Sequence, residues 1–404
     1  MNLKESVLFK NKDLRNFCFY RLIFGISYSF TIPVLPLFFD NIGLDTIIIG
    51  CFMSLYGLSK ALVQVPSGII TDTLGDKIVL VISTTLLALV PITYIFINNN
   101  ILCGSLYIVQ GAILGLAAPA VFSILGRSLD RNHIGESTGF ASAVFTLGGG
   151  IGAFVGGYIL SLTNNFNIVF SISFISILIT VVFIIFKIKK DTNKSKKCEK
   201  SKEPIICRLK VIKNNLTEKK LLSKVVLLCF VALLGDFIYG CVGSIFPFYG
   251  LEVLHATSFY TSTIISIYLF VFGIFAPIAG IVSDKIGIDR QMFISFLVMI
   301  VALFTLGVVR GKIIFAVVIT IYFLGATFLN AALQNSLLGF SKIKDIKGFV
   351  FGVVGASESI GYAIGPIISS NIYKINKNFL FFGLLIFSIF IFLIYLKLHK
   401  KAFY

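Results

Sequence analysis

Apolar stretches of about twenty residues recur along almost the whole chain, and they constrain its fold more than any other feature. Folded as a helix, a stretch of this length crosses the roughly 30 Å hydrocarbon core of a bilayer. Because lipid cannot pair backbone polar groups, each stretch has to be helical, and the sequence lacks the period-two pattern of a membrane barrel. We count twelve stretches, at approximately 17–39, 46–71, 78–97, 101–126, 137–162, 166–186, 225–250, 258–283, 291–309, 313–338, 349–373 and 379–397. The sequence therefore predicts an all-α membrane protein with twelve transmembrane helices.

The distribution of charge predicts how these helices are oriented. If the helices alternate in direction from a cytoplasmic N-terminus, 29 Lys and Arg residues fall on the cytoplasmic side and four on the other side. Positive residues are retained on the cytoplasmic side of membrane proteins. The net charge of +17 therefore reflects topology and not nucleic-acid binding. We expect a multi-pass protein with both termini in the cytoplasm, and the Ile-, Lys- and Asn-rich composition favours a prokaryotic plasma membrane.

One long polar segment divides the chain. Residues 187–224 hold 14 basic and 4 acidic residues, and they predict an irregular cytoplasmic linker that anionic lipid headgroups attract. The flanking segments, 1–186 and 225–404, carry similar motifs at offsets of 211 to 213 residues. The matching pairs are Pro36 and Pro247, Asp72 and Asp284, and Gly139 and Gly352. Because six helices per segment is an even number, the sequence predicts two six-helix bundles that repeat in parallel.

The predicted helix 137–162 is rich in glycine, although each glycine costs about 1 kcal/mol in a helix relative to alanine. Spacings of nine, four and four residues place four of them near one face, namely Gly139, Gly148, Gly152 and Gly156. A smooth face lets a second helix backbone approach closely and leaves the helix able to bend. The predicted helix 349–373 repeats the pattern with Gly361 and Gly365, and Pro366 predicts a kink there.

These motifs resemble those of the major facilitator superfamily. The glycine pattern is similar to the fifth-helix motif of its twelve-helix drug–proton antiporters, G-x8-G-x3-G-P-x2-G, with Ala153 in place of the proline. The turn GIITDTLGDK is similar to the superfamily's loop motif, G-x-x-x-D-R-x-G-R-R/K, which it matches at Gly68, Asp72, Gly75 and Lys77. Thr73 and Asp76 replace two basic residues of that motif, and Tyr107 stands where many antiporters carry an arginine.

The resemblance implies a fold, a function and several roles. The fold is the major facilitator fold, and the function is secondary active transport by alternating access, with proton-coupled efflux of small amphipathic compounds. Asp72 and Asp284 would contact helix N-termini across the cytoplasmic face, hold one conformation closed and release in the other. The alternative is a proton symporter that imports a nutrient such as a sugar or an organic acid. Because the sequence holds no phosphate-binding loop, metal cluster or nucleophile elbow, we expect neither an enzyme nor a cofactor.

Charged residues inside the predicted spans are candidates for proton coupling. There are four of them: Arg21, Lys60, Asp236 and Glu358. Charges within a membrane are costly and usually functional. A buried carboxyl group can bind a proton on one side and release it on the other, and we expect Glu358 first and Asp236 second to do so. Either acid could instead pair with Lys60 or Arg21, and Arg21 could serve only as a headgroup anchor.

The expected substrate cavity has an aromatic and weakly polar wall. Its predicted residues are Lys60, Arg21, Tyr28, Gln64, Tyr239 and Gln334. The predicted partners are a small-molecule substrate, protons as the coupling ion and the lipid bilayer, and the predicted functional form is a monomer. No nucleic acid and no metal are expected.

Overall fold

The computed structural model describes residues 11–97, 99–128, 134–190, 221–340 and 344–403. Within these ranges the chain forms helices and short turns and contains no strand, so the all-α prediction is confirmed. The helices are α2 (Lys12–Ser29), α3 (Val34–Asn41), α4 (Thr46–Leu74), α5 (Asp76–Phe96), α6 (Asn100–Ser128), α7 (Ile134–Thr163), α8 (Phe166–Lys187), α10 (Leu222–Glu252), α11 (Ser258–Ile286), α12 (Ile288–Val308), α13 (Lys312–Phe340), α14 (Lys344–Ile375), the 3-10 turn η2 (Lys377–Phe379) and α15 (Leu380–Phe403). Residues 191–220 of the predicted linker lie outside the described residues, whereas its two ends belong in part to helices, with Lys187 in α8 and residues 222–224 in α10.

The helices account for the predicted membrane spans. Eleven segments of the described chain are long and apolar enough to cross a membrane, judged by length and composition. The first of them, Lys12–Asn41, contains both α2 and α3. A turn that ends at Pro33 separates these two helices and interrupts the predicted first span. Pro33 is the N-cap residue of α3, a position where its missing N–H costs no helix hydrogen bond. The remaining predicted span, 349–373, corresponds to α14, which packs against α10 and α4.

The repeat predicted from the motifs is also present in the residues at which equivalent helices begin and end. The pairs α4 and α11, α5 and α12, and α6 and α13 each begin and end 212 residues apart. The backbone repeats as well, since Gly75 and Gly287 join equivalent helices with φ angles of 93° and 91°. Glycine is the residue that adopts this left-handed region without strain. The division of the chain into units at residues 186 and 225 itself remains a prediction.

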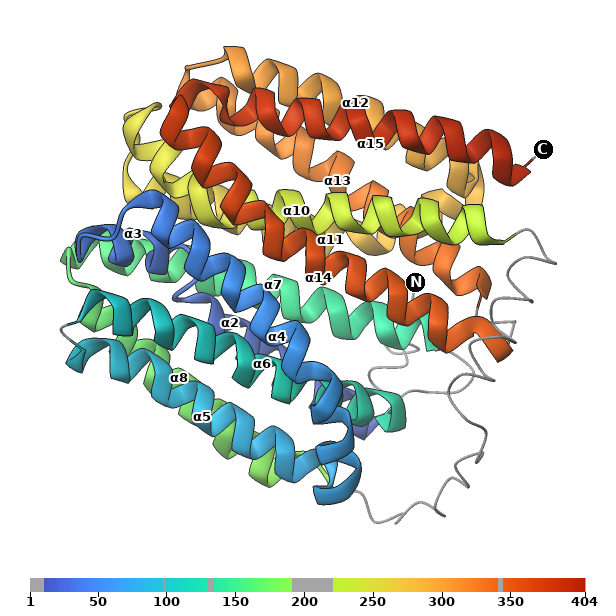
Figure 1. Ribbon diagram of the computed structural model, residues 1–404. Helices are drawn as coiled ribbons and strands as arrows, with labels where there is room; N and C mark the ends of the chain where they lie inside the picture. Colours follow the sequence, from blue (N-terminus) through green and yellow to red (C-terminus); the bar gives the residue numbers. More distant parts are fainter. Residues whose placement is uncertain (1–10, 98, 129–133, 191–220, 341–343, 404) are drawn as a thin grey trace.

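Helices α2 to α8 lie on one side of the molecule and α10 to α15 on the other (Figure 1). Helix α4 packs against α14, and α7 packs against α11, so these two pairs join the halves. The described ends of the chain lie at the same end of the molecule in Figure 1. An even number of crossings in each half produces this arrangement.

The glycine helices form closely packed pairs inside each half. A Cβ atom on Gly148 would lie 2.5 Å from the carbonyl oxygen of Leu22 in α2. A Cβ atom on Gly361 would likewise collide with the carbonyl oxygen of Leu233 in α10. The predicted glycine face is therefore used in both halves, and each half packs a glycine-rich helix directly on a neighbouring backbone.

The two halves touch along a line of small residues that we call the seam. In α4 and α14, Gly50 packs on Ser370, and the hydroxyl of Ser54 accepts a hydrogen bond from the N–H of Ile367 at 3.2 Å. In α7 and α11, Ser266 donates to the carbonyl oxygen of Gly150 at 2.6 Å, and Gly157 packs on Ser262. All of these residues lie toward the end where α4 begins. At the opposite end, a Cβ atom on Gly68 or Gly280 would meet no described atom within 4 Å.

An ion pair joins the halves beside the seam. Asp45 caps the N-terminus of α4, and its carboxylate lies 3.0 Å from the ammonium of Lys374 in α14. The N–H of Ile47 and the charge of Lys374 lower the pKa of the Asp45 carboxyl group. A lowered carboxyl pKa stabilises the folded protein above the ordinary value of about 3.9, and this stabilisation is lost as the pH falls through the lowered pKa.

We therefore expect a small, pH-dependent effect of Asp45→Asn. Asparagine keeps the helix cap but removes the charge, so the variant should be less stable than wild type at pH 7 by at most about 1 kcal/mol, because both side chains are half exposed. The difference between the two melting temperatures should shrink toward zero below about pH 4. Melting curves in nanodiscs between pH 7 and pH 3 would measure this. A difference of unchanged size at pH 3 would contradict the role of the ion pair.

Candidate functional site

A cavity of about 420 Å³ lies between the two halves. Its volume is within the range of about 300–1,000 Å³ that is typical of small-molecule sites. Its wall draws on α2, α4, α6 and α7 from one half and on α10, α11, α13 and α14 from the other. The cavity is therefore positioned by the same helices that meet at the seam, and movement of the halves would change its shape.

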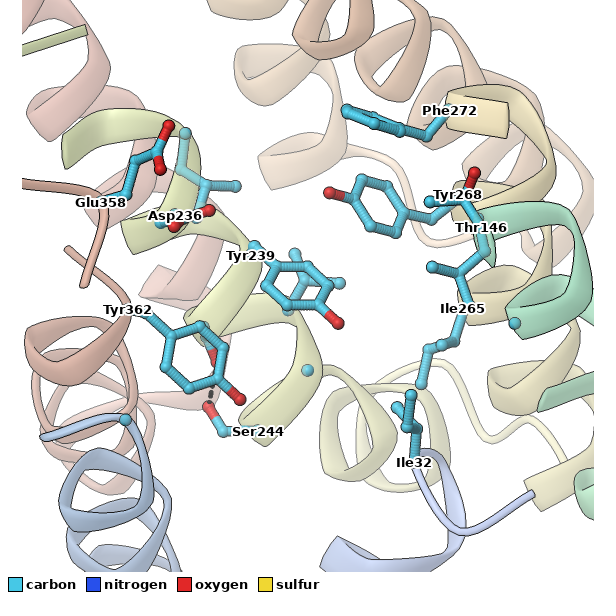
Figure 2. A pocket seen from close by; sticks show the side chains of 18 of the residues that line it. Ile32, Thr146, Asp236, Tyr239, Ser244, Ile265, Tyr268, Phe272, Glu358 and Tyr362 are labelled. Carbon is cyan, nitrogen blue, oxygen red and sulfur yellow. Dashed lines mark hydrogen bonds between the residues drawn. The ribbon is translucent and has the colours of Figure 1, made fainter. Parts of the chain in front are cut away.

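Three of the predicted intramembrane charges line this cavity: Lys60, Asp236 and Glu358. Asp236 of α10 and Glu358 of α14 lie next to each other in Figure 2. Lys60 interacts electrostatically with both acids. In the described part of the chain, however, neither carboxylate makes an ion pair or a hydrogen bond. The two acids are thus open to the cavity, and the group carries a net charge of −1 when all three residues are ionised.

Tyrosine forms much of the remaining wall. The predicted Tyr28 and Tyr239 both line the cavity. The hydroxyl groups of Tyr28 and Tyr56 lie 2.7 Å apart, and the ring of Tyr56 stacks on that of Tyr107 with centroids 4.5 Å apart. Tyr362 joins the two halves, since its ring lies 6.0 Å from that of Tyr56 and 5.7 Å from that of Tyr239. Figure 2 shows Tyr239 and Tyr362 beside the two acids.

The sequence reasoning missed several lining tyrosines, namely Tyr56, Tyr107, Tyr268, Tyr322 and Tyr362. A signal for two of them was present. Tyr56 precedes Lys60 by four residues, and Tyr362 follows Glu358 by four residues, so each shares a helix face with a predicted charge.

Three predicted cavity residues are not among the described residues that line the cavity: Arg21, Gln64 and Gln334. The guanidinium of Arg21 lies over the ring of Phe145 at 3.9 Å, and this ring lines the cavity. Gln64 is half-buried, and Gln334 is exposed. Gln64 follows Lys60 by one helical turn, so it lies on the expected face but closer to the end where α4 finishes.

The residues of the loop motif lie at the end of the molecule away from the seam. Lys77 donates a hydrogen bond from Nζ to the carbonyl oxygen of Ile185 at 2.7 Å. Asp284 is exposed, and the side chain of Asp72 lies outside the described residues. The proposed gating contacts of these two acids therefore remain a prediction. Gly139 falls within α7, and α14 continues as a helix through Pro366.

Asp76 stands where the loop motif has a basic residue, and it forms an ion pair with Arg127. Its buried carboxylate lies 3.0 Å from Nε of Arg127 in α6 and accepts a hydrogen bond from Ser123 at 3.1 Å. Arg127 also donates to the carbonyl oxygen of Lys189 at 2.6 Å. The pair therefore fastens the beginning of α5 to the ends of α6 and α8.

We expect Asp76→Arg to destabilise the protein, although it restores the residue of the family motif. The substitution would place two guanidinium groups together, and breaking a buried ion pair costs about 3–5 kcal/mol, less here because Arg127 is partly exposed. The double variant Asp76→Arg with Arg127→Asp should recover much of the loss. Melting temperatures of the single and double variants would show this. Equal losses in both would contradict a pairing role for Asp76.

The sequence is similar to those of known membrane transporters. The family model of the Major Facilitator Superfamily matches residues 17–366 and, in an overlapping match, residues 228–402. Among curated proteins, the chain is 21% identical to the quinolone resistance protein NorA of Staphylococcus aureus over 378 residues, which cover 91% of both chains. It is 24% identical to an uncharacterised transporter of the same superfamily from Methanocaldococcus jannaschii, but only over 132 residues, or 33% of this chain and 34% of that protein.

A solved structure agrees on the fold. The nucleoside transporter NupG, in a variant form, superposes with a TM-score of 0.75 over 96% of this chain and 100% of its own, at 14% sequence identity. The match to the family model covers most of the chain, and the helical repeat and the central cavity are consistent with it. The chain is therefore a multi-pass membrane protein that belongs to the Major Facilitator Superfamily of transporters.

Proposed function

We propose that the protein is a proton-coupled exporter of small amphipathic compounds that works by alternating access in the plasma membrane. The observation that carries the proposal is the pair of unpaired carboxylates, Asp236 and Glu358, in the central cavity. Charged groups within a membrane normally pair with other groups, so acids that face a cavity are available to protons or to a cationic substrate. A proton and a cation that compete for the same carboxylates would be exchanged across the membrane.

The packing of the halves supports transport of the substrate out of the cytoplasm. The seam joins the halves at one end, whereas Gly68 and Gly280 are open at the other end, which also holds the described ends of the chain. With both termini in the cytoplasm, as the charge distribution predicts, this arrangement is an inward-facing state that receives its substrate from the cytoplasm. The similarity to a quinolone resistance protein also favours export of aromatic compounds. A single chain contains the whole cavity, which favours a monomer.

The proposal can be tested in proteoliposomes that contain a pH-sensitive dye. A permanently charged aromatic cation such as tetraphenylphosphonium, added outside, cannot carry protons through lipid by itself. We expect its entry to drive protons out through the protein, so that the lumen becomes alkaline much faster than in empty liposomes, where only the leak that accompanies passive entry of the cation remains. If none of a panel of aromatic cations moves protons in either direction, proton-coupled cation export is wrong.

Proton-coupled import of a small nutrient is the second candidate, and Lys60 favours it because an ammonium group in the cavity could hold an anion. The same assay separates the two candidate functions by the sign of the pH change in the lumen. A substrate that is imported together with protons would make the lumen acidic when it is added outside. Sugars, organic acids and nucleosides therefore belong in the panel, and acidification by one of them would favour the symporter.

A further inference from the structure

The charged residues that line the cavity are divided between its two walls by sign. Lys60 belongs to α4 in one half, whereas Asp236 and Glu358 belong to α10 and α14 in the other half. Lys60 is exposed and the two acids are half-buried, so each of these side chains keeps accessible surface. The two acids lie next to each other (Figure 2). The cavity therefore offers a cation from one half and two anions from the other to the same ligand.

The contacts between α4 and α14 place Lys60 opposite Glu358. The two helices touch at three successive pairs, namely Gly50 with Ser370, Ser54 with Ile367, and Gly57 with Tyr362. Along these pairs the numbering rises in α4 and falls in α14, so the helices are antiparallel. One further turn along both helices reaches Lys60 and Glu358. These two residues line the cavity and form no ion pair with each other, so the cavity opens between their charges, at the end of the seam.

Tyrosine rings form a second layer next to the three charges. Each charged residue has a lining tyrosine about one turn away on its own helix, namely Tyr56 with Lys60, Tyr239 with Asp236, and Tyr362 with Glu358. Because α4 runs opposite to α10 and α14, all three tyrosines lie on the seam side of the charges. Their rings form a row, with centroid distances of 6.0 Å between Tyr56 and Tyr362 and 5.7 Å between Tyr362 and Tyr239. Aromatic surface thus adjoins both signs of charge.

We propose that the substrates are zwitterionic aromatic compounds, whose carboxylate binds Lys60 and whose ammonium group binds Asp236 and Glu358. Their rings pack on the layer of tyrosines. A purely cationic compound would be repelled by Lys60, and a purely anionic compound would be repelled by the two acids, whereas a zwitterion supplies a partner to every charge. The inference rests on the proposed function, because it takes the cavity to be the substrate site. The ammonium group of the substrate competes with protons for the two carboxylates, as the proposed exchange requires.

Three compounds with one ring system separate the contributions of the two charges. At pH 7, 6-(aminomethyl)-2-naphthoic acid is a zwitterion, its carboxamide is a cation of nearly the same shape, and its N-acetyl derivative is an anion. We expect purified protein in nanodiscs to bind the zwitterion about tenfold more tightly than either of the other two, because one hydrogen bond between charged groups is worth about that factor. Isothermal titration calorimetry would measure this, with empty nanodiscs as the blank.

Lys60→Met removes the ammonium group and keeps an unbranched side chain. The zwitterion should then lose its preference over the carboxamide, because its carboxylate would face only acids. The carboxamide should bind no less tightly than before, because its repulsion by Lys60 is gone, whereas a damaged cavity would weaken both compounds. Lys60→Arg keeps the charge and should keep the preference, and Lys60→Gln makes the same test if Lys60→Met does not fold.

Lys312→Met is the matched control for Lys60→Met. Lys312 is exposed, lies at the beginning of α13 and is not among the described residues that line the cavity. The same loss of charge there should change the affinity for neither compound. Melting temperatures of all variants would show that each has folded.

The outcomes separate this inference from the proposed function. Wild-type protein that binds the carboxamide or the anion as tightly as the zwitterion, or binds none of the three, would overturn the inference without any variant. A preference that survives in Lys60→Met would also overturn it. In each of these cases, proton movement driven by tetraphenylphosphonium would still support the exporter. A preference that is lost in Lys60→Met supports the substrate class even if no compound moves protons in liposomes, in which case only proton coupling is wrong.

Discussion

Glu358→Gln should abolish proton movement driven by an aromatic cation in proteoliposomes, with a loss of at least tenfold in the initial rate of the pH change. Glutamine has nearly the same shape as glutamate but cannot exchange a proton. In the structure Glu358 lines the cavity, makes no ion pair with a described residue and lies beside Asp236, so its substitution leaves no partner unpaired. The protein should therefore fold normally and lose coupling only. Binding of the same cation, measured in nanodiscs, should weaken by a smaller factor because Asp236 remains.

Glu252→Gln is the matched control for this experiment. Glu252 accepts a hydrogen bond from Tyr373 at 2.7 Å and pairs with Lys377 at 2.6 Å, at the far end of α10 and outside the cavity lining. The same chemical change there should leave proton movement near the wild-type rate. If Glu358→Gln moves protons as fast as wild type, Glu358 is not the carrier, and Asp236→Asn becomes the decisive variant.

Gly148→Leu should eliminate transport while the protein is still inserted in the membrane. A Cβ atom at this position would already lie 2.5 Å from the carbonyl oxygen of Leu22, and a leucine side chain would force α2 and α7 apart. Overpacking of this kind typically costs about 1–3 kcal/mol and displaces backbone. Because both helices line the cavity, the displacement would distort the site as well as the pairing of helices. Transport assays and melting temperatures on the same purified sample would record both effects.

Gly126→Leu provides the comparison. Gly126 lies in α6, where a Cβ atom would meet no described atom within 4 Å. The same substitution at this open position should reduce transport by less than about twofold. Normal transport in Gly148→Leu would show that close contact between α2 and α7 is dispensable, and a comparable loss in both variants would show that the effect is not specific to packing.

Much of the fold could be predicted because its determinants are local or periodic. Apolar length identifies the spans, the offset of about 212 residues identifies the repeat, and glycine spacing identifies the packed faces. The break between α2 and α3 was missed, although Pro33 and Pro36 are visible in the sequence. Prolines inside other helices, such as Pro66 and Pro247, leave the helix continuous, so proline alone does not locate a break.

The site could be predicted in part, and the errors have a common cause. The charges Lys60, Asp236 and Glu358 line the cavity as expected. Gln64 lies on the expected side of its helix but one turn away from the lining. Helical spacing reveals which residues share a face, but it does not reveal how deep the cavity extends along the helices, because that depth depends on where the two halves separate. The role of each residue in transport remains a prediction.

The composition of the seam has a consequence for how it opens. Apolar surfaces that separate must be wetted at a free-energy cost that grows with their area. At the seam, three serines lie against glycines of the opposing helices, namely Ser262, Ser266 and Ser370, and Ser54 accepts a hydrogen bond from the backbone of Ile367. When the halves part, water can take over the hydrogen bonds of these hydroxyl groups, and the glycines expose little hydrocarbon. The closed face is thus held by contacts that hydrate readily, and under the proposed alternating-access mechanism this would lower the free-energy cost of opening the seam.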